Sequence, residues 1–90
     1  MSNVAGAQSA NPTAPVVTAL QSRPENVPAL NVRSLAFARL GQFGPALSDA
    51  GRSVVLAPRS PFGYLNRAEA NEGLGDLRAM SLDLRRAAAL

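Results

Sequence analysis

Two segments of this chain repeat one pattern at a spacing of thirty-four residues, and that spacing restricts the fold more than any other feature. Moving the sequence by thirty-four residues places Leu40-Gly41 on Leu74-Gly75. A fixed period of this length is typical of proteins in which one small unit of structure is stacked on the next. The same shift also places further residues on identical ones: Pro24 on Pro58, Arg33 on Arg67, Ala36 on Ala70, Asp49 on Asp83, Arg52 on Arg86 and Leu56 on Leu90.

Start and stop signals divide the first copy into two helices. Asn26 is a good N-cap, and Pro28 fits the first turn that follows it. We expect this helix over residues 27–40, with its end at Gly41, because only glycine adopts the left-handed stop without a steric penalty. A second helix is expected from residue 43 or 44 to residue 56.

The second copy carries the same signals. Ser60-Pro61 starts a helix that should reach Leu74, and Gly75 ends it. Asp76 caps a last helix, expected over residues 77–90. Because the connections are only two or three residues long, neighbouring helices must be antiparallel. The sequence therefore predicts an all-α fold of antiparallel helix-turn-helix units.

Apolar residues recur at helical spacing in the first copy. In its first helix Leu30, Phe37 and Leu40, with the small Ser34 between them, should form one buried face. In its second helix the expected buried stripe consists of Phe43, Ala46, Leu47, Ala50, Val54 and Ala57.

The segment before the first copy has two parts. Residues 1–14 are rich in Ala, Ser, Asn, Pro and Gly, and we interpret them as a disordered tail. Residues 15–22 are apolar enough for two helical turns, and a shift of thirty-four aligns them with residues 49–56. Residues 15–26 are therefore predicted to be a short capping helix or partial repeat, followed by repeats over residues 27–60 and 61–90.

Composition argues against an enzyme. The chain of 90 residues has no cysteine or histidine, so it lacks disulfides, thiolate metal sites and the usual general base. Glu69 and Glu72 share one helix face, but acid–base catalysis needs carboxylates that flank an enclosed cleft. Gly73-Leu74-Gly75 lacks the strand and the Gly-Lys-Ser/Thr of a phosphate loop. We expect no catalytic residue, no metal site and no cofactor.

Charge and hydropathy indicate little about location or partners. The net charge is +3, and every cation is an arginine, spread from Arg23 to Arg86. Spread charge is more typical of a solvated surface than of a nucleic-acid site. The N-terminal residues have neither a basic start nor a long apolar run, so no signal peptide or membrane span is expected. A cytoplasmic location fits the missing cysteines.

Two ion pairs follow from the repeat. Arg33 and Asp49 are sixteen residues apart, as are Arg67 and Asp83. In a hairpin that turns at the glycine, both members of a pair lie at similar distances from the turn, one on each helix. We predict that Arg33 pairs with Asp49 and that Arg67 pairs with Asp83. The alternative is two sets of solvated charges, each pair contributing about 0–1 kcal/mol.

These features together resemble the tetratricopeptide repeat (TPR) family, with two repeats over about residues 27–90. The family usually has Leu where this chain has Arg33 and Arg67. The resemblance implies a short right-handed solenoid of about five helices. The residues that carry it are the large first-helix residues Leu30 and Tyr64, the small Ser34 and Ala68, the turn glycines Gly41 and Gly75, the aromatic Phe43 and the closing Pro58.

The resemblance also implies a concave groove lined by the first helix of each repeat. Glu69 and Glu72 would repel the terminal carboxylate of a peptide, so we expect an apolar segment with an occasional cation as the partner. The open alternative is that this face is only solvated surface. The residues implied to line the groove are Asn31, Leu35, Ala38, Arg39, Phe62, Leu65, Glu69 and Glu72.

Apolar residues near the C-terminus suggest a second contact surface. They would lie uncovered, so we expect either self-association or a continuation of the solenoid. The function predicted is a non-catalytic protein–protein interaction scaffold for a protein or peptide partner. Alternatives are an Arg-rich helical-repeat RNA-binding module and a repeat assembly without a partner. The residues of the second surface are Met80, Leu84, Ala87, Ala88 and Leu90.

Overall fold

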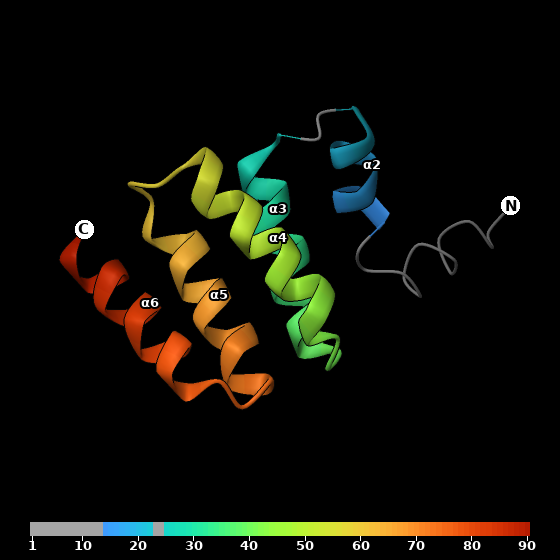
Figure 1. Cartoon of the computed structure of the whole chain (residues 1–90). Helices are drawn as coiled ribbons and strands as arrows, with labels where there is room; N and C mark the ends of the chain where they lie inside the picture. The colour runs from blue at the N-terminus through green and yellow to red at the C-terminus, as the bar shows by residue number, and fades with distance from the viewer. Residues whose placement is uncertain (1–13, 23–24) are drawn as a thin grey trace, which may run out of the picture.

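The computed structural model describes residues 14–22 and 25–90 of the chain. The described residues form α-helices joined by short turns and contain no β-strand, as Figure 1 shows. The predicted tail over residues 1–14 lies outside the described residues, apart from Ala14, which begins the first of these helices. The helices are α2 (Ala14–Ser22), α3 (Val27–Arg39), α4 (Phe43–Leu56), α5 (Pro61–Gly73) and α6 (Leu77–Ala89).

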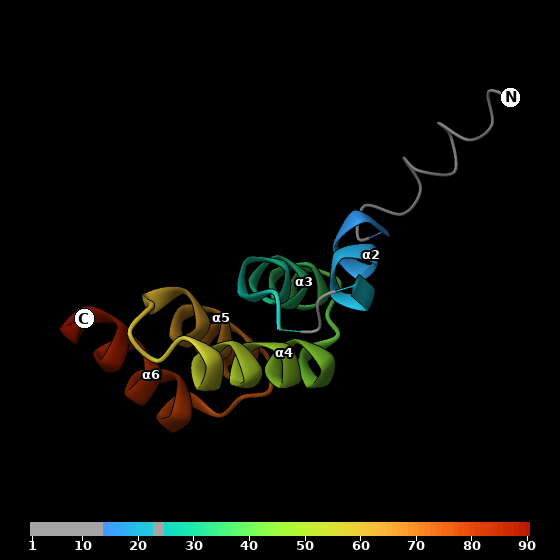
Figure 2. The same ribbon diagram turned by 90° about the horizontal axis from the view of Figure 1, so that it is seen from above.

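Consecutive helices pack against one another in chain order. α3 pairs with α4 and α5 with α6 as two antiparallel hairpins, and α5 also contacts both helices of the first hairpin. α2 packs on α3 at one end of the array, and α6 lies at the other end (Figures 1 and 2). The expected all-α fold of stacked helix pairs is confirmed.

The two hairpin turns have the same geometry. Gly41 has φ of 77° and Gly75 has φ of 80°, the left-handed region in which glycine meets no steric penalty. In the first turn Gly41 N–H donates to Ala38 O at 3.0 Å and Gln42 N–H donates to Phe37 O at 2.8 Å. This is the Schellman arrangement, and it satisfies carbonyl groups that the end of a helix leaves free. The same two bonds recur after α5, where Gly75 and Asp76 donate at 3.0 and 2.8 Å.

Polar side chains cap three of the helices as the sequence predicts. Asn26 Oδ1 accepts from Ala29 N–H at 3.0 Å, and Asp76 Oδ1 accepts from Ala79 N–H at 3.0 Å. Ser60 Oγ accepts from Phe62 N–H over a longer 3.4 Å. The bounds of α3 to α6 agree with the expected ones to within one residue. Local capping chemistry therefore determines where these helices begin and end.

The core is built mainly from small side chains. Ala38, Ala46 and Ala70 form a buried cluster where α3, α4 and α5 meet, and Ala46 and Ala70 are fully buried. The expected position of Leu40 in the core is wrong, because 65 % of this residue is exposed. Leu40 is the C-cap of α3, so it lies in the turn at the end of the hairpin, where no neighbouring helix covers it.

α5 approaches the first hairpin through a row of small residues. A Cβ atom on Gly63 would lie 2.9 Å from Ser53 Oγ, and one on Gly73 would collide with the ring of Phe43. Between them in the sequence, Ala70 packs against the alanines of α3 and α4. Glycine and alanine at these positions therefore allow the two hairpins to pack in close contact.

Candidate interaction surfaces

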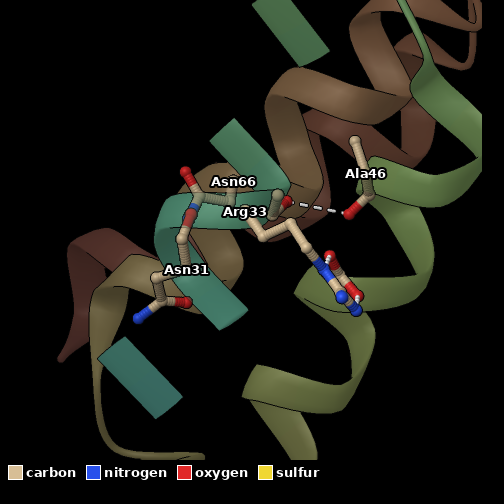
Figure 3. Close-up of polar contacts among 6 residues, drawn as sticks. Asn31, Arg33, Ala46 and Asn66 are labelled. Carbon is tan, nitrogen blue, oxygen red and sulfur yellow. Dashed lines mark hydrogen bonds and ion pairs between the residues drawn. The ribbon is translucent and has the colours of Figure 1, made fainter. Parts of the chain in front are cut away.

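Each hairpin contains one bidentate ion pair between its two helices. Arg33 Nε donates to Asp49 Oδ2 at 2.7 Å, and Nη2 donates to Oδ1 at 2.9 Å. Arg67 holds Asp83 through the same atoms at 2.8 and 2.9 Å. The structure thus brings together both pairs that the sequence spacing indicates. Figure 3 shows Arg33 extending from α3 toward α4.

The carboxylates of these pairs are buried and the guanidinium groups are partly open to solvent. Asp49 is 7 % exposed and Asp83 is 5 % exposed. The hydrogen bond to Asp49 raises the pKa of Arg33 above its ordinary value, and the bond to Asp83 does the same for the pKa of Arg67, although burial opposes both shifts. Both arginines therefore stay charged, and each compensates a carboxylate that would be costly to bury alone.

An aromatic ring lies beside each guanidinium. Arg33 Cζ is 5.7 Å from the centroid of Phe37, and Arg67 Cζ is 5.9 Å from the centroid of Tyr64. The ring comes one turn after the arginine in α3 but almost one turn before it in α5. Both hairpins therefore have an arginine–aromatic contact, although the aromatic residue stands at a different repeat position in each. These ring contacts indicate that each ion pair has a structural role in its hairpin.

The residues predicted to line the groove fall into two groups. Ala38 is only 8 % exposed and lies in the contact between the hairpins. Asn31 is also part of that contact, since Asn66 Nδ2 of α5 donates to its backbone oxygen at 3.1 Å. Within the first hairpin, Ser53 Oγ of α4 donates to Asn31 Oδ1 at 2.6 Å. Figure 3 shows Asn31 and Asn66 at this junction. The others are at least partly exposed: Leu35, Arg39, Phe62, Leu65, Glu69 and Glu72.

One of the acidic groove residues has a cationic neighbour. Arg39 Nε lies 3.6 Å from Glu69 Oε2, which links α3 to α5 at the surface. Both side chains are well exposed, so the pair contributes about 0–1 kcal/mol. None of the ion pairs found among the described residues includes Glu72.

A hollow between α5 and α6 joins the predicted groove to the predicted self-association surface. Its volume is about 440 Å³. Leu65, Glu69 and Glu72 come from the groove prediction, whereas Met80 and Leu84 come from the prediction for the last helix. Ala87 is half-buried, and Ala88 and Leu90 are exposed farther along the chain. The sequence indicates two separate surfaces. The structure brings residues of both together in one hollow.

Two further hollows lie beside the ion pairs. Arg33, Asp49 and Arg52 line one of them together with Leu20 of α2, and its volume is about 490 Å³. Arg67, Asp83 and Arg86 line the other at the equivalent place in the second hairpin. The repeat spacing of Arg52 and Arg86 was the signal that could have pointed to them. The other exposed arginines lie on several elements: Arg39 on α3, Arg59 between α4 and α5, and Arg78 and Arg85 on α6.

Residues 14–22 and 25–90 contain no group of three or more His, Cys, Asp or Glu side chains placed to hold a metal ion. Within the same residues, no helix combines the length and the apolar character that crossing a membrane would require.

The class of protein that this structure defines is an all-α array of stacked helical hairpins. Over 58 residues, or 64 % of this chain, it is 41 % identical to the E3 ubiquitin-protein ligase TTC3 of Rattus norvegicus. Over 65 residues, or 72 % of this chain, it is 38 % identical to serine/threonine-protein phosphatase 5 of Homo sapiens. Both relatives contain tetratricopeptide repeats, which generally mediate protein–protein interaction.

The aligned stretch is a small part of each relative. It spans 3 % of the length of TTC3 and 13 % of the length of phosphatase 5. No family model matches the chain, and no solved structure matches it.

Proposed function

We propose that this chain is a pair of tetratricopeptide-type repeats with a partial repeat before them, and that it acts as a non-catalytic protein–protein interaction module. Its partner is a peptide or a helix of another protein, held on the face that α3 and α5 share. The likeness to two repeat-containing relatives and the equal turns at Gly41 and Gly75 support this proposal.

The packing of α2 supports the partial repeat. Leu20 of α2 shares a buried cluster with Ala29 and Leu30 of α3. Thirty-four residues later, Val54 of α4 lies against Gly63 of α5. Leu20 and Val54 are equivalent in the repeat, and so are Ala29 and Gly63. α2 thus packs on α3 as the last turns of α4 pack on α5.

The observation that carries the binding function is the set of exposed apolar side chains on α3 and α5. Leu35, Phe62 and Leu65 are 36, 62 and 42 % exposed, on two helices that contact each other. Such a surface favours an apolar segment of a partner. Glu69 and Glu72 border it, so a partner with a cation is favoured over one that ends in a carboxylate at this place.

A capture experiment tests the proposed function. The immobilised chain should retain a protein partner that is lost when Leu35 and Phe62 are changed to Ser, or when Leu65 is changed to Ser together with Glu69→Lys. A chain carrying Glu25→Lys, a change at an exposed site that is 70 % open in its side chain, serves as the control. Capture that is equal for all these chains, or no specific capture at all, would count against the proposed function.

A further inference from the structure

The surface that α5 covers on the first hairpin has a counterpart on the second hairpin. We call the covered surface the inner seat and its counterpart the outer seat. The inner seat consists of Asn31, Ser34 and Ala38 of α3 with Ala46, Ala50 and Ser53 of α4. A shift of thirty-four gives the outer seat, Leu65, Ala68 and Glu72 of α5 with Met80, Leu84 and Ala87 of α6.

The inner seat is covered except at Asn31, which is half-buried. Ser34, Ala46, Ala50 and Ser53 are 0 % exposed, and Ala38 is 8 % exposed. Asn66 of α5 reaches the backbone of Asn31, and Ala70 of α5 packs on Ala38 and Ala46. The inner seat therefore shows how a helix lies on one of these hairpins and which residues it covers.

The outer seat is only partly covered in the described structure, although Ala68 is 2 % exposed and Met80 and Ala87 are half-buried. Five of its six residues line the hollow of about 440 Å³ between α5 and α6, and Glu69 is the sixth residue of that lining. Leu65 and Leu84 are 42 and 44 % exposed. Figure 2 shows α6 at the outer edge of the array, with no described helix beyond it.

The outer seat is more apolar than the inner seat. Leu65 replaces Asn31, Met80 replaces Ala46 and Leu84 replaces Ala50. A surface made only to face water would gain nothing from these larger apolar side chains, whereas a helix lying on them removes them from water. The substitutions thus favour an apolar helix face as the occupant.

Glu72 determines which charge a helix on the outer seat should carry at the point where it covers this residue. It stands where the inner seat has Ala38, the residue that Ala70 of α5 covers. A helix in the same pose would cover the carboxylate of Glu72, and a covered carboxylate needs a cation or it becomes costly. Glu69 lies beside it in the same hollow and adds to the negative charge.

We propose that the outer seat binds an amphipathic helix of a partner protein that lies on α5 and α6 as α5 lies on α3 and α4. Its apolar stripe covers Leu65, Met80 and Leu84. It carries an Arg or Lys in its last turn, at the place that corresponds to Ala70 of α5, and this cation pairs with Glu72. The inference rests on the proposed function and specifies the kind of partner that the second hairpin takes.

A titration with a designed helix tests this inference. The probe is a stapled peptide of Ala and Leu with one Arg in its last turn, where Ala70 lies in α5, and the matched probe has Glu in place of that Arg. The whole chain, labelled at Leu and Met methyl groups, is followed by NMR. We expect saturable shifts at Met80, Leu84 and Leu65, and binding of the Arg peptide that is about tenfold tighter than binding of the Glu peptide.

Charge reversal on the chain gives the decisive comparison. In Glu72→Lys the preference should reverse, so that the Glu peptide binds more tightly, whereas Glu25→Lys should keep the original preference. Leu84→Asp should abolish the shifts for both peptides, with circular dichroism to show that the variant stays helical. Shifts confined to another face, or a preference that Glu72→Lys leaves unchanged, would overturn the inference.

Two outcomes separate this inference from the proposed function. If the captured partner is lost with the Leu35 and Phe62 changes but kept with Leu84→Asp, the proposed function stands and the outer seat is not where the partner helix binds. If sedimentation shows a dimer that Leu84→Asp dissociates, a second copy of the chain occupies the seat and the inference is overturned.

Discussion

Gly63 of α5 lies so close to Val54 of α4 that a Cβ atom on the glycine would stand 3.0 Å from the Val54 backbone nitrogen. Backbone atoms cannot move aside as the end of a flexible side chain can. The two hairpins thus depend on the absence of a side chain at this position. Gly63 is therefore required for helix packing, unlike a helical glycine whose Cβ position is open.

Gly63→Ala is expected to destabilise the fold by about 1–3 kcal/mol, as overpacking of a close contact does, although alanine favours helix formation. Gly51→Ala is the matched control, because Gly51 also lies inside a helix and a Cβ there would meet nothing within 4 Å. That control should stabilise the fold by about 0.4–1 kcal/mol. Urea unfolding of both variants measures the difference, and stabilisation by both substitutions would contradict the close contact.

Arg67→Met should destabilise the fold by about 1–3 kcal/mol, less than the loss of a fully buried pair, because the Arg67 side chain is 31 % exposed. The change leaves the buried Asp83 carboxylate without its partner. Arg52→Met is the control, because Arg52 and Glu25 approach only to 3.6 Å and both are exposed. A control change within about 0.5 kcal/mol is expected from thermal unfolding. Equal losses of unfolding free energy in the two variants would show that the buried Arg67–Asp83 pair stabilises the fold no more than the exposed Arg52–Glu25 pair does.

The cost of Arg67→Met should not vary between about pH 6 and pH 8. The hydrogen bond to Asp83 raises the pKa of Arg67 in the folded chain above its ordinary value. A raised folded pKa gives stabilisation that is fully present below the unfolded pKa and is lost only as the pH rises through the folded pKa. Both values for an arginine lie above this window. Unfolding free energies at the two pH values check this, and a cost that falls toward pH 8 would argue against the pairing.

Gly41→Ala should destabilise the first hairpin by about 1–2 kcal/mol, since an L-residue at φ of 77° places its Cβ too close to the backbone. No neighbouring atom lies within 4 Å of that Cβ position, so the cost would come from the backbone conformation alone. Gly44→Ala, in the first turn of α4 and equally open, is the control and should cost nothing. Thermal unfolding of the two variants should separate them by several degrees for a domain of this size.

The sequence predicted the helices well because their ends depend on local chemistry. Asn26 and Asp76 cap helices through bonds that span three residues, and Gly41 and Gly75 end helices through bonds within a single turn. Such signals need no knowledge of the rest of the fold. The repeat then supplied the antiparallel pairing, because residues at equal distances from a turn lie opposite each other.

Burial was predicted less well because it depends on which helix arrives from elsewhere in the chain. Asp49 and Ser53 lie in α4 at positions that α3 and α5 cover, yet hydropathy alone marks both as surface residues. Gly63 and Gly73 each allow a close contact with α4, although glycine inside a helix lowers its intrinsic stability. A spacing of ten residues between these two glycines, with Ala70 between them, was the signal for a contact face.

The polar contacts that hold this chain together span short distances along the sequence. Both bidentate pairs bridge sixteen residues, and the bond from Asn66 to Asn31 bridges only thirty-five. Because residues that contact each other are close in the sequence, closing the loops between them costs little chain entropy. The chain should therefore fold rapidly, and folding should start at either hairpin. Amide hydrogens should then exchange in blocks, with α2 opening most readily, because it lies at the end of the array and packs mainly on α3.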